Sequence, residues 1–190
     1  MKLVFATHNQ HKFEEIKNMV PAYIELLSLD DIGCTEDIPE TADTISENAI
    51  LKAEYVSAHY KYDCFADDTG LEVHALNGAP GVYSARYAGE HKNSEDNIDK
   101  LLGELENKID RSARFITVIA LHLKDHENLF TGICAGNIVE ERSGTKGFGY
   151  DSIFQPEGFK RTFAEMELSE KAEIGHRGKA FQSLIQYLEK

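Results

Sequence analysis

Two adjacent carboxylates, Asp67 and Asp68, directly follow the apolar residues 64–66. Carboxylates this close repel each other unless a cation or hydrogen-bond donors compensate their charge. Mg²⁺ suits that role because it prefers oxygen ligands, takes one or two carboxylates, and leaves its other positions to water and substrate phosphates. The ordinary alternative is an acidic turn in which an Asp caps backbone N–H groups before Gly70. The pair is therefore a candidate metal centre for phosphate chemistry.

A second polar group, Thr7, Asn9 and Lys12, lies between the apolar residues 3–6 and a helical pattern. Where a strand turns into a helix, unpaired backbone N–H groups and the positive end of the helix dipole favour an anion. The turn is therefore a candidate phosphate site, although the segment is not the glycine-rich loop of P-loop proteins. The alternative is that Thr7 or Asn9 only caps the helix and that Lys12 is solvated.

Further charged residues are candidates for the same chemistry. Glu40 and Glu47 are candidates to complete the metal shell, although in an acidic chain most glutamates are simply solvated. Four basic residues are candidates to neutralise phosphate or to hydrogen-bond a base, and the alternative for each is an ordinary place on a helix surface. These four are Lys52, Lys171, His176 and Arg177.

A glycine-rich stretch, residues 144–149, leads to Tyr150 and Asp151. Phe148 and Tyr150 in such a loop can present aromatic faces on which a nucleobase stacks. The alternative is that both aromatic side chains belong to the core. The loop therefore indicates a base-binding segment only in combination with the phosphate groups.

The apolar periodicity predicts strands and helices that intermix along the chain. The expected strands are residues 3–6, 24–29, 64–66, 71–75, 114–123 and 129–139, and the expected helices are 13–20 ending before Pro21, one capped by Ser46, 94–105 and 179–188. This order predicts an α/β or α+β fold with a mixed sheet. It also predicts that the two carboxylates lie at a junction between strands.

Composition and charge limit the class of protein. A chain of 190 residues that is 42% hydrophobic and has four prolines predicts a single domain, residues 1–190. The net charge of −13 repels polyanions, so we expect no nucleic-acid polymer as a partner. Three cysteines without CxxC spacing predict neither a disulfide framework nor a zinc site, and they favour a reducing compartment. No apolar stretch has the length of a signal peptide or a membrane span, so we expect a soluble, cytoplasmic protein.

Taken in order, these segments resemble the Ham1-like inosine triphosphate pyrophosphatase family, whose members hydrolyse non-canonical purine nucleoside triphosphates to the monophosphate and pyrophosphate. The resemblance spans almost the whole chain. Each motif is weak alone, but their ordered co-occurrence is specific. The motifs are THNQHK at 7–12, ENA at 47–49 with KA at 52–53, ADDTGL at 66–71, GAPGVYSARY at 78–87, GFGYD at 147–151, Met166 with EK at 170–171, and HR at 176–177.

The resemblance implies the fold, the assembly and the roles of the site residues. It implies an elongated mixed β-sheet flanked by helices, two lobes around a central cleft, a homodimer, and Mg²⁺ as the cofactor for ITP, dITP or XTP hydrolysis. Asp68 would be the general base and a metal ligand, with Glu40 as the second ligand. Glu47 and Asp67 are the less favoured metal ligands, and Asp67 is otherwise a supporting carboxylate. The substrate-binding residues implied are Thr7, His8, Asn9, Gln10, His11, Lys12, Lys52, Thr69, Phe148, Gly149, Tyr150, Asp151, Lys171, His176 and Arg177.

Three positions depart from the family pattern. Thr69 stands where Ser is usual and keeps the hydroxyl, whereas Ser152 replaces Pro and Gly175 replaces Ser. The last two changes affect the expected detail of purine selectivity, not the reaction. Two other functions stay open: a pyrophosphatase for other aberrant nucleotides such as modified pyrimidines, and a non-catalytic nucleotide-binding module. The intact Asp67, Asp68 and Lys12 speak against the module.

Overall fold

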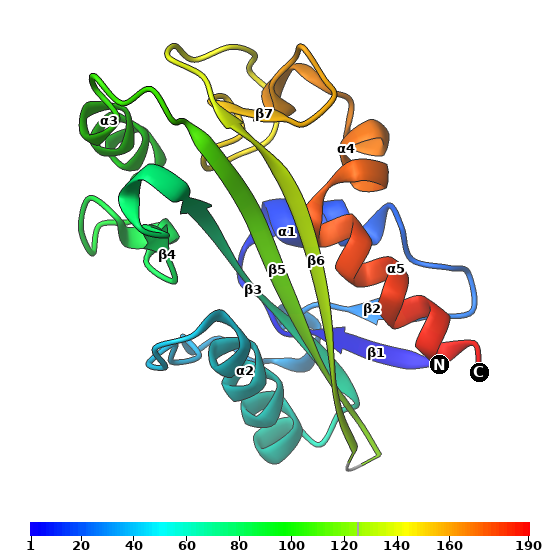
Figure 1. Ribbon diagram of the computed structural model, residues 1–190. Helices are drawn as coiled ribbons and strands as arrows, with labels where there is room; N and C mark the ends of the chain where they lie inside the picture. Colours follow the sequence, from blue (N-terminus) through cyan, green and yellow to red (C-terminus); the bar gives the residue numbers. More distant parts are fainter. Residues whose placement is uncertain (125) are drawn as a thin grey trace. The chain divides into compact units, whose positions relative to one another are not determined.

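The computed structural model describes residues 1–124 and 126–190, and Figure 1 shows its helices and strands. The helices are α1 (Gln10–Lys17), α2 (Ile45–Tyr60), α3 (Ser94–Glu104), α4 (Leu168–Ile174) and α5 (His176–Leu188). The strands are β1 (Lys2–Phe5), β2 (Glu25–Leu27), β3 (Cys64–Val73), β4 (Pro80–Gly81), β5 (Ser112–Leu123), β6 (His126–Ile138) and β7 (Phe154–Pro156). None of the helices in these two ranges is long and apolar enough to cross a membrane.

The strands form one mixed sheet in the order β2-β1-β3-β5-β6-β7, with β4 paired to β3. Strand β1 runs parallel to both β2 and β3, whereas β4 is antiparallel to β3 and β7 is antiparallel to β6. Because β1 and β3 are parallel, a crossover must join them, and helix α2 lies in that connection. The predicted class, a mixed α and β fold with a mixed sheet, is confirmed.

The chain divides into two compact units. Unit 1 comprises Met1–Asp68, Thr117–Gly132 and Arg177–Lys190, and unit 2 comprises Thr69–Ile116 and Ile133–His176. Each unit has a hydrophobic core of its own. The division falls between Asp68 and Thr69 and again between His176 and Arg177, so the predicted site residues are distributed over both units.

The core of unit 1 lies on the face of β1 and β3 that carries Phe5 and Phe65. These two rings are partners in the strand register and stack with centroids 4.6 Å apart. Ile16 of α1 and Phe181 of α5 pack on the same face. On the opposite face Cys64 donates its thiol to a backbone carbonyl of α2, and Figure 1 shows α2 and α5 on opposite sides of these strands. The sheet of unit 1 is thus covered on both faces.

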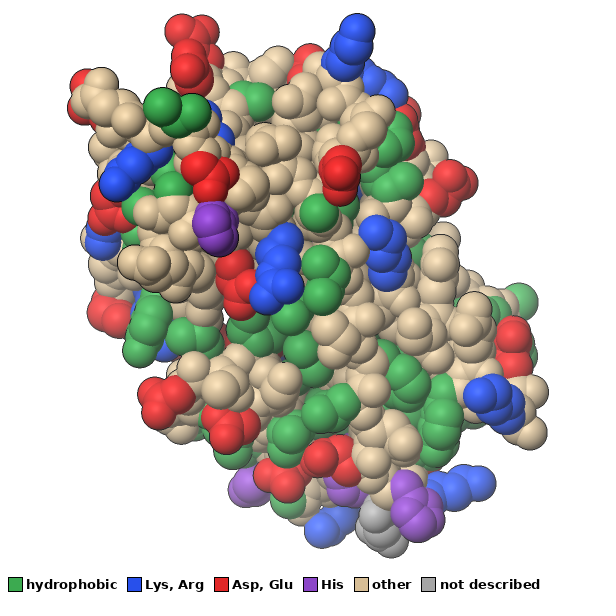
Figure 2. All heavy atoms as spheres, in the orientation of Figure 1, with side chains coloured by type: hydrophobic (Ala, Val, Ile, Leu, Met, Phe, Trp, Pro, Cys, Tyr) green, Lys and Arg blue, Asp and Glu red, His purple; other side chains and the backbone are tan. Residues whose placement is uncertain are grey.

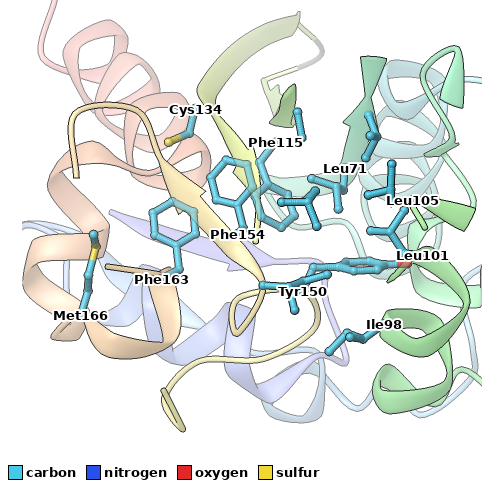
Figure 3. Close-up of a cluster of buried hydrophobic side chains, with 14 residues drawn as sticks. Leu71, Ile98, Leu101, Leu105, Phe115, Cys134, Tyr150, Phe154, Phe163 and Met166 are labelled. Atoms are coloured by element: carbon cyan, nitrogen blue, oxygen red, sulfur yellow. The ribbon is translucent and has the colours of Figure 1, made fainter. Parts of the chain in front are cut away.

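The core of unit 2 is built around three phenylalanines, Phe115, Phe154 and Phe163 (Figure 3). Phe115 meets the ring of Phe154 edge to face at 4.7 Å. The apolar face of α3, with Leu101 fully buried, packs against the same cluster. Tyr150 and Ile153, in the loop that follows β6, belong to this core, so the core of unit 2 holds the loop in place.

Two local predictions are wrong. Thr44, not Ser46, caps α2, because Thr44 has extended backbone angles and its side chain accepts a hydrogen bond from the N–H of Glu47. The two carboxylates do not lie at a strand junction but inside β3, which continues through them to Val73. A strand can run through charged residues when their side chains are paired, as both of these are.

Candidate active site

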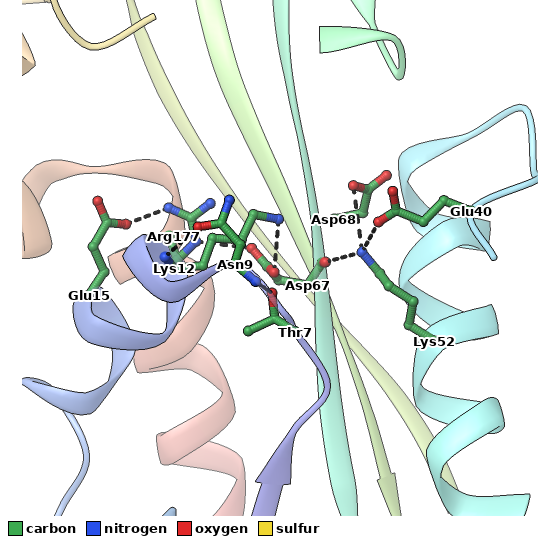
Figure 4. A network of polar contacts seen from close by, with 9 residues as sticks. All are labelled: Thr7, Asn9, Lys12, Glu15, Glu40, Lys52, Asp67, Asp68 and Arg177. Atoms are coloured by element: carbon green, nitrogen blue, oxygen red, sulfur yellow. Dashed lines mark hydrogen bonds and ion pairs between the residues drawn. The ribbon is translucent and has the colours of Figure 1, made fainter. Parts of the chain in front are cut away.

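The strand β3 separates Asp67 from Asp68. Successive side chains of a strand point to opposite faces, so Asp67 lies on the face of Phe65, where α1 and α5 pack, and Asp68 lies on the face of α2. Figure 4 shows the two carboxylates directed away from each other. The mutual repulsion predicted from their adjacency is reduced by this geometry, and each carboxylate meets its own cations.

Asp67 is fully buried and holds two cations. One carboxylate oxygen accepts from Lys12 Nζ at 3.0 Å, and the other accepts from Arg177 Nε at 3.0 Å. A terminal guanidinium nitrogen of Arg177 donates in turn to the buried Glu15. This chain of alternating charges joins β3, α1 and α5, and its hydrogen bonds compensate the charges that burial leaves without water.

Two helices position the cations of Asp67. Asn9 caps α1 with its side-chain oxygen, which accepts from Lys12 N at 3.1 Å, so α1 begins at Gln10. Lys12 and Glu15 are three residues apart and therefore share one side of the helix. Arg177 stands in the first turn of α5, where Phe181 of the same helix fixes the packing against the sheet.

Asp68 lies beside Lys52 and Glu40. The Lys52 ammonium donates to the carbonyl of Asp67 at 2.7 Å, stands 3.8 Å from a carboxylate oxygen of Asp68, and forms an ion pair with Glu40. Lys52 projects from α2, and Glu40 comes from the loop that precedes it (Figure 4). The Lys52 ammonium thus lies beside both carboxylates that the sequence predicts as metal ligands, Asp68 and Glu40.

The donor set of Asp68 and Glu40 fits Mg²⁺. Both carboxylates already converge on a positive charge, and Mg²⁺ is commonly bound by one or two carboxylates with substrate phosphates and waters. Among the described residues no group of three or more His, Cys, Asp and Glu side chains could hold a metal ion. The chemistry of the site therefore agrees with a cation shared with a phosphate ligand, not with an all-protein cage.

The environments push the pKa values of the two aspartates apart. Burial opposes ionisation of Asp67, but the charges of Lys12, Arg177 and Lys52 outweigh it and hold its pKa below the usual value. Burial raises the pKa of Asp68, and the nearby cations Lys52 and Lys12 do not offset that effect fully. Asp67 is thus a fixed anion, whereas Asp68 is the better proton acceptor, a division that often marks acid–base sites.

The N-terminal turn agrees with the capping alternative at Asn9 but not with a solvated Lys12. Asn9 caps the helix, and the hydroxyl of Thr7 accepts from the N–H of Asn9 at 3.2 Å. Lys12 is not a solvated surface residue, because its side chain is only 14% exposed and pairs with Asp67. Burial lowers the pKa of Lys12 despite this partner. The side chains of Gln10 and His11 are exposed on the first turn of α1.

The glycine-rich loop of unit 2 is closed by Asp151. Its carboxylate accepts from the N–H of Phe148 at 2.9 Å and from Lys171 Nζ at 2.5 Å. A side chain at Gly147, whose φ is +73°, would lie 2.0 Å from the same carboxylate, so the turn requires glycine there. The Lys171 ammonium also lies 5.1 Å from the centre of the Phe148 ring. The loop is thus an ordered turn.

The remaining predicted base-pocket residues of unit 2 lie deeper. Tyr150 is part of the core and donates its hydroxyl to the carbonyl of Ser84 at 2.8 Å, as the alternative reading expected. The ring of His176 is buried and stacks on Phe115 with centroids 4.4 Å apart. Phe148 and Gly149 are half-buried, so they are more accessible than the buried side chains of Tyr150, Asp151 and His176.

The predicted site residues form one group in each unit, and Glu47 belongs to neither group. Glu47 is not beside Asp68; its carboxylate accepts from the hydroxyl of Thr44 at 2.8 Å at the start of α2. Glu15 was missed by sequence reasoning, and its only local signal is the spacing of three from Lys12. Within unit 1 the site brings together Thr7, Asn9, Lys12, Glu40, Lys52, Asp67, Asp68 and Arg177. Within unit 2 the predicted residues are Thr69, Phe148, Gly149, Tyr150, Asp151, Lys171 and His176.

Sequence comparison finds similar proteins over almost the whole chain. Residues 3–187 match the model of the Ham1 family. A dITP/XTP pyrophosphatase of Christiangramia forsetii is 69% identical over 190 residues, which is 100% of both chains. A dITP/XTP pyrophosphatase of Porphyromonas gingivalis is 52% identical over 98% of this chain and 97% of its own.

Solved structures of the same kind share the fold. The Ham1 protein of Staphylococcus aureus superposes with a TM-score of 0.90 at 40% sequence identity, covering 100% of this chain and 98% of its own. A HAM1 protein of Coxiella burnetii gives a TM-score of 0.91 at 37% identity with the same coverage. The similarity therefore extends over both units.

Proposed function

Because the chain belongs to the Ham1 family, we propose that it hydrolyses non-canonical purine nucleoside triphosphates, namely ITP, dITP and XTP, to the monophosphate and pyrophosphate. This activity removes aberrant nucleotides from the precursor pool. The observation that carries the proposal is the division of two adjacent carboxylates between separate cation clusters, one with Lys12 and one with Lys52.

The triphosphate binds at the N-terminal turn and the basic side chains next to it. The turn from Thr7 to Lys12 offers hydroxyl and amide groups, backbone N–H groups and the positive end of α1. Lys12 and Lys52 neutralise phosphate oxygens. His8, Gln10 and His11 complete the set of side chains on the turn that we assign to the substrate.

Mg²⁺ is the proposed cofactor, held by Asp68 and Glu40. When bound it spreads the charge that develops on the phosphoryl oxygens. Asp67 supports the site from the other face of β3 by fixing Lys12 and Arg177. Glu47 is the less favoured second ligand because its carboxylate is engaged at the N-terminus of α2.

Asp68 is the proposed general base. It takes a proton from water, the water oxygen attacks the α-phosphorus, and the bond from that phosphorus to the bridging oxygen breaks, so that pyrophosphate leaves. Burial raises the pKa of Asp68, which makes it a stronger base than an aspartate in water. Lys12 and Lys52 stabilise the departing pyrophosphate, and catalysis is chiefly positioning and charge stabilisation.

The purine is recognised by the residues of the loop and of the segment that follows. Phe148 offers its face for stacking, and Gly149, Tyr150, Asp151 and Lys171 shape the turn around it. His176 and Arg177 are the proposed donors to the 6-oxo group, and Thr69 adds a hydroxyl. A buried donor left unpaired by a 6-amino purine costs about 1–3 kcal/mol, which disfavours ATP.

The decisive experiment is pyrophosphate release from ITP by the wild type and by Asp68→Asn. Asn keeps the shape of the side chain but cannot accept the proton, so we expect a loss of about 100-fold or more in kcat. Asp30→Asn, a substitution in an exposed turn, is the matched control and should retain activity. Near-normal turnover by Asp68→Asn would remove the assignment of the base.

A substrate panel tests the class of nucleotide. ITP, dITP and XTP should be hydrolysed in preference to ATP, GTP and a modified pyrimidine triphosphate. Preference for the pyrimidine would favour the rival pyrophosphatase, and nucleotide binding without turnover would favour a binding module. We further propose that the chain, a single two-lobed domain over residues 1–190, is a cytoplasmic homodimer. Light scattering at several protein concentrations tests the homodimer.

A further inference from the structure

We propose that Glu36 is a positioning residue that fixes the loop before α2, so that Glu40 faces Lys52 and Asp68. This inference rests on the proposed function only for its catalytic consequence. Glu36 lies outside every motif of the resemblance and touches neither Lys52 nor Asp68 in the contacts described above. Its role follows from what surrounds it in unit 1.

Glu36 is an exposed residue with an unusually complete set of partners. One carboxylate oxygen accepts from the hydroxyl of Tyr55 at 2.9 Å and from that of Tyr60 at 2.7 Å. The other accepts from the N–H of Thr35 at 3.1 Å. The backbone carbonyl of Glu36 lies 3.0 Å from the ring Nε2 of His8. The residue is therefore tied both to α2 and to the phosphate turn.

Although Glu36 is exposed, hydrogen bonds to its carboxylate stabilise the ionised form. The Tyr60 hydroxyl, with backbone donors and Tyr55, lowers the pKa of Glu36 to about 2. The same carboxylate raises the pKa of Tyr55 and Tyr60, since each hydroxyl is held in its protonated, donating form. The arrangement is thus a set of charge-assisted hydrogen bonds and not a chance surface contact.

Helix α2 carries both the anchor and its target. Lys52 and Tyr55 are three residues apart, so their side chains share one side of the helix, and Tyr60 is the last residue of that helix. Lys52 forms the ion pair with Glu40, and Tyr55 binds Glu36. The loop is therefore attached to one rigid element at two points.

The chain between those two points is short and stiff. Only three residues separate Glu36 from Glu40, and a chain step of four residues spans at most about 14 Å. Pro39 has a fixed φ, and it restricts Ile38 to extended conformations. Once Glu36 is anchored, Glu40 has few positions available to it, and the one observed places its carboxylate on Lys52.

A native thiol reports whether the loop is in place. Cys34, two residues before Glu36, is fully buried, and the Tyr60 hydroxyl hydrogen-bonds its side chain. Cys64, at the start of β3, is fully buried under α2 and donates to the carbonyl of Ala53. Opening of the loop exposes Cys34 alone, whereas unfolding of unit 1 exposes both thiols.

The experiment compares iodoacetamide labelling of Cys34 and Cys64 in the ligand-free protein, quantified by peptide mass spectrometry. Glu36→Ala should raise the labelling rate of Cys34 about tenfold with no change at Cys64, and Tyr55→Phe should raise it less because one hydroxyl remains. Glu36→Gln keeps an oxygen acceptor and should restore most of the protection. Tyr62→Phe, an exposed tyrosine after α2, is the matched control.

The second arm measures Mg²⁺. Glu36→Ala should weaken binding of Mg²⁺ alone, measured by calorimetry, and raise the Mg²⁺ concentration for half-maximal ITP hydrolysis about three- to tenfold, with kcat at saturating Mg²⁺ within about twofold of wild type. Unchanged Cys34 labelling would overturn the anchor. Faster labelling with unchanged Mg²⁺ dependence and binding would overturn the positioning role. An inactive wild-type protein would contradict the proposed function, while labelling and calorimetry would still decide the role of Glu36.

Discussion

At the scale of a single residue, the buried carboxylate of Asp67 binds two cations and holds them in place. A carboxylate with no exposed surface cannot take its charge compensation from water, so Lys12 and Arg177 must supply it. Glu15 supplies a second negative charge, so two buried acids balance the two cations. Removing any member leaves an uncompensated buried charge, so Asp67 acts as one part of a charge network.

The substitution Asp67→Asn should lower the free energy of unfolding at pH 7 by about 3–5 kcal/mol, because it breaks a buried ion network on one side. Urea denaturation measures this change. Asp99→Asn, which removes an exposed partner of Arg142, is the control and should cost about 1 kcal/mol or less. A comparable loss in both variants would contradict a special role for burial.

The same variant has a predictable pH dependence. The folded-state pKa of Asp67 is below its unfolded value of 3.8, so its stabilisation is fully present above pH 3.8 and is lost as the pH falls below it. The difference between wild type and Asp67→Asn should therefore be constant from pH 7 to about pH 5 and shrink below pH 3.8. A difference that instead shrinks between pH 7 and pH 5 would indicate another titrating group.

The pKa of Asp68 is shifted in the opposite direction from that of Asp67. Burial raises its pKa above 3.8, and a general base must be ionised, so the acid limb of kcat/KM for ITP should lie above pH 3.8. A pH–rate profile measures the limb, which belongs to Asp68 together with the coupled carboxylate of Glu40. A limb at or below pH 3.8 would mean that the cations win over burial in the free enzyme.

At the scale of elements, sequence patterns predicted most strands and helices because apolar spacing follows from one-sided packing. Residues 114–123 and 94–105 were recognised in this way, as β5 and α3. Two features, the cap of α2 and the role of Glu15, were not predicted from the sequence, and each has a physical reason. Both Thr44 and Ser46 have a hydroxyl, and only the backbone conformation distinguishes a cap from a helical residue. Glu15 pairs with Arg177, 162 positions away, and no local pattern records such a contact.

The start of α2 provides a test at this scale. Thr44→Ala removes the side chain that accepts from the N–H of Glu47 and should cost about 1 kcal/mol of unfolding free energy. Ser46→Ala, inside the first turn, should be neutral or slightly stabilising because Ala has the higher helix propensity. Thermal or urea unfolding of both variants measures the difference, and the reverse order would restore Ser46 as the cap.

At the scale of the whole molecule, we expect the net charge to limit which phosphate compounds bind. The chain has 33 acidic and 20 basic side chains, and the face shown in Figure 2 carries acidic groups among its scattered basic ones. A polyanion needs a continuous basic surface, whereas a triphosphate needs only the local groups of the turn and two lysines. Composition alone predicted this exclusion, but it could not say that Lys12 and Lys52 lie on the two faces of β3.

A binding assay checks the exclusion. Labelled duplex or single-stranded DNA should show no rise in fluorescence anisotropy with the protein at micromolar concentration in 50 mM salt, because the net charge of −13 repels it. A labelled non-hydrolysable ITP analogue under the same conditions should bind. Binding of DNA that weakens with salt would reveal a basic surface that the net charge conceals.

The backbone of β3 acts as a partition between Asp67 and Asp68, and this has a consequence for evolution and engineering. Residues that are neighbours in the sequence cannot replace each other here, since each is reached only from its own side of the sheet. A one-residue deletion upstream in β3 would turn Asp68, the proposed base, toward Lys12 and Arg177 and away from Lys52 and Glu40. A substitution at Asp67 or Asp68 should therefore be tolerated more readily than a one-residue shift of β3, because a substitution alters one side chain and a shift moves both to the opposite faces.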